Sequence, residues 1–221
     1  MGPELFDYAF RTYSQRWMFK HPTPSDFFRT MEDASAMDLD WFWRGWFYTT
    51  DYTDIGVKGV KQFYLTDKPT KKAKKSAERY NINLDNYEGK LIYYAEVEEG
   101  INPEHAKKST DFEVLNAYLE SLNEAERLLL KEAPNHIYEV TFEKPGGLVM
   151  PIILEITYED GTKERKQYPS QIWRYNENEV QKVFKTNKAI ISFVVDPDLE
   201  TADVDTSNNT WPRKVEETKF D

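Results

Sequence analysis

The sequence predicts an α+β protein in which a short, aromatic-rich helical segment precedes an Ig-like antiparallel β-sandwich with a helical insertion. Two observations predict this fold. The first 50 residues hold 14 of the 33 Phe, Trp and Tyr residues in a chain of 221. After residue 54 the hydrophobic pattern changes from a helical period toward the period of two that strands show. We therefore divide the chain into a helical domain, residues 1–52, and a sandwich domain, residues 53–221.

Three helices are predicted in the helical domain, over about residues 3–20, 24–35 and 38–48. Thr23 and Pro24 supply the cap and the first turn of the second helix, and Asp38 is placed to cap the third. Apolar side chains follow offsets of three and four along the third helix, at Leu39, Phe42, Trp43, Trp46 and Phe47. We interpret this Trp-rich stretch as a core helix rather than a sugar-binding platform, because its spacing is helical.

The sandwich domain shows strand patterns interrupted by one helical pattern. Strands are predicted over about 55–65, 91–97, 138–142, 152–158, 162–168 and 189–195, with a short one at 171–173. We expect 138–142 and 152–158 to pair as antiparallel neighbours across the turn at 144–147, 162–168 to be an edge strand and 189–195 to be an inner strand. A capping box at 110–113 begins one helix of about 22 residues, the predicted insertion at about 110–132.

The composition is that of a globular protein with a polar exterior. Lys and Arg number 29 against 39 Asp and Glu, and the net charge of −10 disfavours nucleic acid and anionic membranes as partners. The basic run at 68–75 is therefore expected to be a solvated loop. The absence of cysteine excludes disulfides, thiolate zinc sites and cysteine nucleophiles. No stretch approaches the roughly 18 apolar residues of a membrane span.

No catalytic, cofactor-binding or metal-ligating residue can be assigned from motifs. The histidines, His21, His105 and His136, form no pair at metal-ligand spacing, and the chain has no His-Glu-x-x-His. Carboxylates beside tryptophans, at Glu32–Asp33 and Asp38–Asp40, are what a glycosidase needs, but helix capping and helix position explain them better. A glycosidase would require two acids about 5–10 Å apart in a cleft.

Oxygen-bearing side chains gather between Asp196 and Asn209, which raises the alternative of a calcium site. The spacing of these residues does not match that of an EF-hand calcium loop. Counting from Asp203, the sixth position is Asn208 instead of glycine, and the twelfth is Lys214 instead of glutamate. The other interpretation is an Asx-rich loop between strands, and the sequence leaves both open.

The segment His21–Ser35, continued by Asp38–Phe47, resembles the end of the catalytic domain in M1 family zinc metallopeptidases, the gluzincin aminopeptidases. The shared pattern is a Thr/Pro-initiated helix with Asp-Phe, then Ser, Asp-Leu and a Trp-rich helix. The exit Tyr48–Asp51 is similar to bacterial members. Weaker similarities to the sandwich that follows in the family lie at Gly147–Ile152, Tyr158–Gly161, Phe193–Pro197 and Asn208–Asn209, whereas residues about 66–135 match no family motif.

The resemblance implies the C-terminal, non-catalytic portion of a zinc aminopeptidase whose parent hydrolyses peptides, with zinc polarising the peptide carbonyl and glutamate as general base. The zinc motif precedes this point in the family, so no catalytic or zinc residue transfers to this chain. It is expected to be inactive alone, to support an upstream catalytic domain of the same polypeptide and to self-associate through exposed aromatic residues. The residues give no location for this chain, and only the resemblance implies a periplasmic or extracellular location for the parent. The rival hypothesis is a stand-alone protein- or carbohydrate-binding β-sandwich module.

Overall fold

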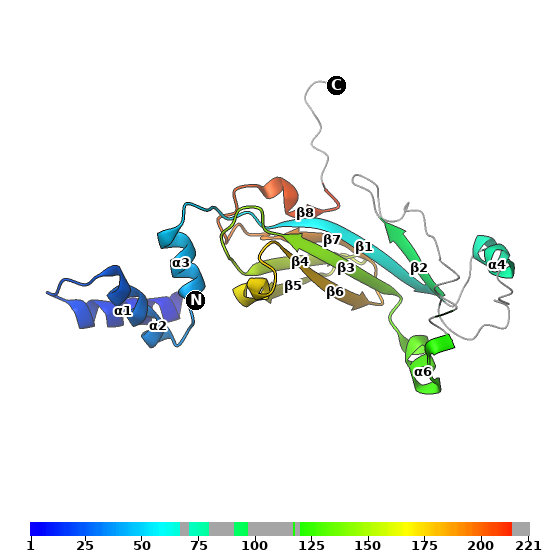
Figure 1. Ribbon diagram of the computed structural model, residues 1–221, viewed down its shortest axis with the longest axis horizontal. Coiled ribbons are helices and arrows are strands. Elements are labelled where there is room, and N and C mark those ends of the chain that lie inside the picture. The colour runs from blue at the N-terminus through cyan, green and yellow to red at the C-terminus, as the bar shows by residue number, and fades with distance from the viewer. Residues whose placement is uncertain (67–70, 80–90, 97–116, 118–119, 214–221) are drawn as a thin grey trace, which may run out of the picture.

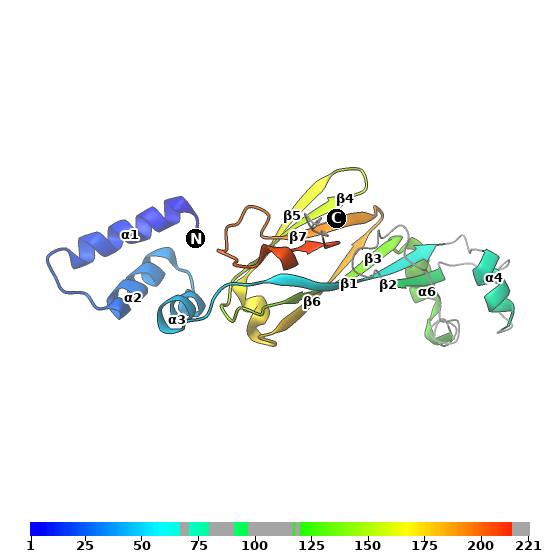
Figure 2. The ribbon, with the colours of Figure 1, turned by 90° about the horizontal axis from the view of Figure 1, so that it is seen from above.

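A computed structural model describes residues 1–66, 71–79, 91–96, 117 and 120–213. In that part the chain is α+β, with helices at both ends and two antiparallel sheets between them (Figure 1). The N-terminal helices α1, α2 and α3 form one end of the elongated molecule, and α4 and α6 lie at the other (Figure 2). The α+β class predicted from the sequence is confirmed.

The N-terminal helices are α1 (Pro3–Trp17), α2 (Pro24–Ser35) and α3 (Asp40–Tyr48). At the start of α2 the carboxylate of Asp26 accepts hydrogen bonds from the backbone N–H and the hydroxyl of Thr23, at 2.8 and 2.7 Å. The first helix ends three residues earlier than predicted. The third begins two residues later than predicted, with Leu39 at the N-cap, although the Asp38 carboxylate still accepts the backbone N–H of Asp40 at 3.2 Å.

All strand pairs are antiparallel. The first sheet has the order β2 (Leu91–Glu96), β1 (Gly56–Thr66), β3 (His136–Glu143), β6 (Glu179–Thr186). The second has the order β5 (Lys163–Tyr168), β4 (Ile152–Tyr158), β7 (Ile190–Val195), β8 (Thr210–Trp211). As predicted, β5 is an edge strand and β7 an inner one, whereas β6 and β8 were not anticipated.

The predicted pairing of 138–142 with 152–158 is wrong, because β3 and β4 belong to different sheets. The segment between them lies along residues 52–54 instead of making a hairpin turn. The backbone N–H of Tyr52 donates to the Gly146 carbonyl at 3.1 Å, and the N–H of Leu148 donates to the Tyr52 carbonyl at 3.2 Å. A Cβ atom on Gly146 would lie 2.4 Å from that Tyr52 oxygen, so the close approach requires glycine.

Two helical segments also differ from prediction. The expected strand at 171–173 is a 3-10 helix, η3 (Ser170–Arg174), in which Ser170 and Trp173, three residues apart, are both buried. The basic run was expected to be a loop, yet Lys71–Glu78 forms α4, while its residues 68–70 lie outside the described part.

The predicted continuous helix over 110–132 is wrong within the described residues, because a new helix, α6 (Glu124–Glu132), begins near its end. The Asn123 side chain accepts the Glu126 backbone N–H at 3.0 Å, and the Glu126 carboxylate accepts the Asn123 N–H at 2.9 Å. This reciprocal pair is a helix start, so the periodic pattern crosses a break. The capping box predicted at 110–113 lies outside the described residues.

Both sheets contribute to one hydrophobic core. Its buried members are Ile55, Val57, Val60, Tyr138, Val140, Phe142, Ile152, Leu154, Ile156, Trp173, Phe184, Ile190, Phe193, Val195 and Trp211. A second, smaller cluster lies among the N-terminal helices and comprises Ala9, Phe28, Met31, Leu39 and Trp43. Helix α3 packs tightly on the loop before β4, because a Cβ on Gly45 would lie 2.7 Å from Cδ2 of Leu148.

Candidate functional site

The three N-terminal helices share a set of touching aromatic rings, here called the aromatic network. Tyr13 of α1 packs edge-on against Phe27 of α2, with ring centroids 4.9 Å apart. Phe28 of α2 stacks on Trp43 of α3 at 4.6 Å. Through further ring contacts the network comprises Phe6, Phe10, Tyr13, Phe27, Phe28, Trp41, Phe42, Trp43, Trp46, Phe47 and Tyr48.

One part of the aromatic network is buried and the other part is exposed. Phe28 and Trp43 are buried, so the interpretation of the Trp-rich stretch as core is correct for Trp43. It also holds for Phe42, which is partly buried against the same cluster, but it is wrong for the end of α3, where Trp46 and Tyr48 are 42% and 67% exposed. The exposed members of the network are Phe6, Phe10, Trp46, Phe47 and Tyr48. Scattered exposed rings are ordinary, but rings joined in one network form a patch of the kind that meets a partner.

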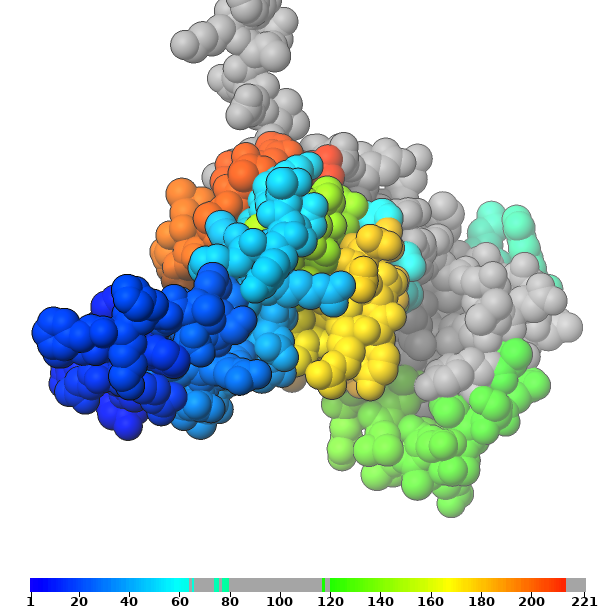
Figure 3. Space-filling view, turned by 60° about the vertical axis from the view of Figure 1, so that its left-hand side comes forward, coloured from blue at the N-terminus to red at the C-terminus, as the bar shows by residue number. Residues whose placement is uncertain are grey.

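A groove of about 370 Å³ lies where the start of α3 meets η3. The space-filling view shows the yellow residues around η3 close to the light-blue α3 (Figure 3). The groove is lined by Asp38, Asp40, Trp41, Val149, Ser170, Gln171, Trp173, Arg174 and Glu177. The structure thus brings the sequence-predicted carboxylates of Asp38 and Asp40 beside a tryptophan. It adds Glu177, which the sequence gave no reason to select because it lies 137 positions beyond Asp40.

The other predicted carboxylates have structural contacts. The Glu32 carboxylate accepts the backbone N–H of Leu39 at 3.0 Å and so joins α2 to the start of α3. Asp33 pairs with Arg16 of α1 at 3.3 Å, and both side chains are largely exposed. Neither residue lines the groove. Half of the carboxylates singled out for a glycosidase therefore stabilise the helix packing instead.

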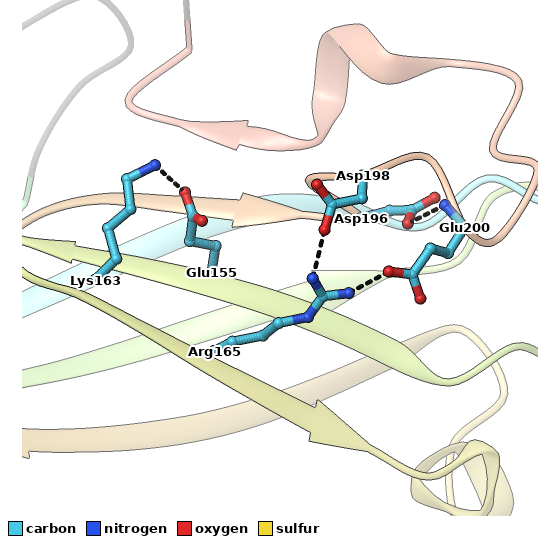
Figure 4. Close-up of polar contacts among 6 residues, drawn as sticks. All are labelled: Glu155, Lys163, Arg165, Asp196, Asp198 and Glu200. Atoms are coloured by element: carbon cyan, nitrogen blue, oxygen red, sulfur yellow. Dashed lines mark hydrogen bonds and ion pairs between the residues drawn. The ribbon is translucent and has the colours of Figure 1, made fainter. Parts of the chain in front are cut away.

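The acids that follow β7 bind the backbone and an arginine (Figure 4). The Asp196 carboxylate accepts the backbone N–H groups of Glu200 and Thr201 at 2.7 and 2.9 Å, and the Thr201 hydroxyl at 2.6 Å. Arg165 of β5 extends its two terminal nitrogens to Asp198 and Glu200. These contacts fix the loop against the edge of the second sheet.

The acids of the later loop bind the start of β1. Asp203 accepts the backbone N–H of Ile55 at 3.1 Å, and the Asn208 amide donates to Asp54 at 2.7 Å. Burial raises the pKa of Asp203, and the nearby charge of Asp54 raises that pKa further. Asp205 accepts the Ser207 N–H, as in an Asx turn. These hydrogen bonds favour the Asx-rich loop over the calcium site.

The two histidines that the structure describes, neither of which the sequence assigned to a metal site, lie in different parts of the chain. His21 precedes α2, His136 begins β3, and His105 lies outside the described residues. Within the described ranges no group of three or more His, Asp or Glu side chains could hold a metal ion. None of the described helices has the length and apolar character needed to cross a membrane.

Lys144, which the sequence did not single out, is a buried amine at the end of the strand β3. Its Nζ donates to the Gly147 carbonyl at 2.7 Å. Burial lowers the pKa of Lys144, while the charges of Glu177 and Asp51 oppose that change. Lys144 therefore makes two interactions. Its amine donates a hydrogen bond to the loop before β4, and its positive charge interacts with the carboxylate of Glu177 at the groove.

Comparison with known proteins gives no relative for this chain. No protein-family model, no curated protein and no solved structure matches it. The functional candidates therefore rest on geometry, and they are the exposed part of the aromatic network and the groove beside Trp41.

Proposed function

We propose that the chain is the C-terminal, non-catalytic portion of an M1-like zinc aminopeptidase of bacterial type. In this proposal the exposed part of the aromatic network packs against a helical catalytic domain upstream in the same polypeptide. The single observation that carries the proposal is the network itself. It continues from the buried pair Phe28 and Trp43 to exposed rings at both of its ends.

Burial of these rings would supply the energy of the contact. Full burial of a large apolar side chain is worth about 1.5–3 kcal/mol. The exposed members are roughly half-exposed, so covering each would add roughly 1 kcal/mol. Several such contributions together suit a permanent interface within one polypeptide.

The two sheets are proposed to form the Ig-like sandwich that follows the catalytic domain. The shared core of β1, β3, β4, β6, β7 and β8 supports this assignment. Zinc and the general base belong to the upstream domain in this proposal. The present chain is proposed to contribute no zinc ligand, and in the part of it that the structure describes no group of three or more His, Asp or Glu side chains could hold a metal ion.

The reading frame upstream of residue 1 in the full-length transcript tests the proposal. An in-frame His-Glu-x-x-His followed by a downstream glutamate would support it. A complete upstream frame without that motif would overturn the assignment and favour the stand-alone binding module.

The non-catalytic role has its own test, in which zinc content and peptidase activity are measured on one purified sample of the chain. We expect no stoichiometric zinc and no turnover of aminoacyl or peptide reporters. Stoichiometric zinc with chelator-sensitive turnover would contradict the proposal.

A further inference from the structure

We propose that the groove between α3 and η3 binds a neutral sugar, with the sugar ring on the indole face of Trp41. The sugar hydroxyls would bond to the polar side chains of the groove wall. This inference does not depend on the aminopeptidase proposal, because the groove is formed by residues of this chain alone.

The walls of the groove are held in place by contacts that need no ligand. The Trp41 indole N–H donates to the Asp38 carbonyl at 3.2 Å, which fixes the ring relative to the start of α3. On the opposite wall, the buried Trp173 donates to the Met150 carbonyl at 2.9 Å. The tight contact between Gly45 on α3 and Leu148 in the loop before β4 holds the two walls together. A preformed site of this kind loses little conformational entropy when it binds a ligand.

The polar groups on the walls are available to a ligand. Among the described residues, the side chains of Asp40, Arg174 and Glu177 have no hydrogen-bonded partner. Gln171 accepts one long contact of 3.5 Å from the Ser170 hydroxyl. The wall therefore offers both acceptors and donors, and sugar hydroxyls both donate and accept.

The charges of the groove distinguish between ligand classes. Three carboxylates and one guanidinium give the wall a net charge of −2, which opposes anions. The same net charge attracts cations, so a cationic peptide is the competing occupant, whereas a neutral polyol can bond to the carboxylates and the guanidinium alike. Trp41 supplies the flat apolar surface that the C–H face of a sugar ring can cover. The volume of about 370 Å³ falls at the small end of ligand sites, which span about 300–1,000 Å³.

Binding can be measured by saturation-transfer NMR on the full chain, with a panel of neutral hexoses, N-acetylhexosamines and their disaccharides. We expect at least one sugar to bind and Trp41→Ala to weaken its binding about tenfold, equivalent to about 1.4 kcal/mol. Trp46→Ala is the matched control, because Trp46 lies on the same helix outside the groove lining and is also partly exposed. Its sugar affinity should be unchanged.

Two further variants test whether polar side chains of the groove contact the sugar, and their unfolding temperatures distinguish a loss of contact from a loss of folding. Asp40→Asn changes an exposed group and should weaken binding while leaving the unfolding temperature unchanged. Glu177→Gln should also weaken binding, and because it removes a charge that acts on the buried Lys144, its unfolding temperature is measured alongside. The proposal is wrong if no sugar of the panel binds at millimolar concentration. It is also wrong if a trilysine peptide binds through Trp41 and sugars do not, or if sugar binding survives Trp41→Ala. None of these outcomes depends on an upstream catalytic domain.

Discussion

The phenol oxygen of Tyr138 on β3 accepts a hydrogen bond from the backbone N–H of Ile190 on β7, at 2.8 Å, inside the core that the two sheets share. The Gln62 side-chain amide of β1 donates to the same oxygen at 2.8 Å. Tyr138 is fully buried, so water cannot replace either contact. One hydroxyl thus joins two neighbouring strands of the first sheet to an inner strand of the second.

Removal of that hydroxyl should destabilise the fold. Tyr138→Phe leaves two buried donors without an acceptor, each costing about 1–3 kcal/mol. We expect the free energy of unfolding, measured by urea denaturation, to fall by roughly 2 kcal/mol or more. Tyr175→Phe is the control, because Tyr175 is 98% exposed and should show no change. Equal stabilities of the two variants would contradict the role of Tyr138.

The stability of the fold should be sensitive to the addition of one methyl group at Gly146, in the segment that connects β3 of the first sheet to β4 of the second. In Gly146→Ala the new Cβ would meet the Tyr52 carbonyl at 2.4 Å and the Asp54 nitrogen at 2.6 Å, and backbone atoms cannot move aside easily. We expect a loss of about 1–3 kcal/mol in thermal or chemical unfolding. Gly59→Ala on β1 is matched, because nothing lies within 4 Å of its added Cβ. It should leave stability equal or slightly higher.

The hydrogen bond from the Tyr158 hydroxyl to Glu164, 2.6 Å long, should be lost at both ends of the pH scale. Burial, followed by this bond to Glu164, raises the pKa of Tyr158 to about 12. Its stabilising effect is complete below the ordinary phenol pKa of 10 and is lost as the pH rises through about 12. Burial also raises the pKa of Tyr168, so absorbance titration at 295 nm of Tyr158→Phe should show one late-ionising tyrosine fewer than the wild-type chain.

At the acidic end, the hydrogen bond from Tyr158 lowers the pKa of Glu164 from its ordinary value of 4.5. The contribution to stability is present above pH 4.5 and is lost as the pH falls through the lowered value. In Tyr158→Phe the Glu164 pKa, followed by NMR, should therefore rise. An unchanged Glu164 pKa in that variant would show that the bond is absent in solution.

The exposed part of the aromatic network should make the isolated chain self-associate. We expect light scattering to show a mass that increases with concentration, and the double variant Phe6→Glu, Phe10→Glu to restore a monomer. Phe19→Glu is the control, because Phe19 is 99% exposed but lies outside the network, and it should still associate. A wild-type chain that stays monomeric at high concentration would contradict the prediction.

Local patterns were sufficient for the three N-terminal helices and for most strands, but not for α4, η3 or α6. Phe27, Phe28 and Met31 gave the period of α2, alternation gave β3 and β4, and apolar residues on both faces gave β7. Strand partners are set by contacts between distant residues, so the position of Gly146 beside Tyr52 could not be inferred from its neighbours. The strand β6 was missed because Phe184 is its one buried side chain, which leaves little alternation to detect.

The residues of one wall of the groove could be singled out from the sequence. Asp38, Asp40 and Trp41 are close in sequence and were singled out as carboxylates beside tryptophan. On the second wall, residues 171–173 were expected to form a short strand, because three residues are too few to distinguish the period of a strand from that of the 3-10 helix that the structure has there. The sequence also did not determine which aromatic residues of α3 stay exposed. Helical spacing shows which side chains share one face of the helix, but not which other part of the protein covers that face.

The hydrogen bond from Ile55 to Asp203 spans 148 residues, and it has a consequence for synthesis of the protein. The ribosome adds about 5–20 residues each second, so roughly 7–30 s pass between the emergence of these two partners. During that interval β1 has neither its Asp203 anchor nor the core side chain of Trp211. The nascent chain must therefore keep an incomplete apolar surface out of contact with its neighbours, and this is a period in which chaperones would be expected to bind it.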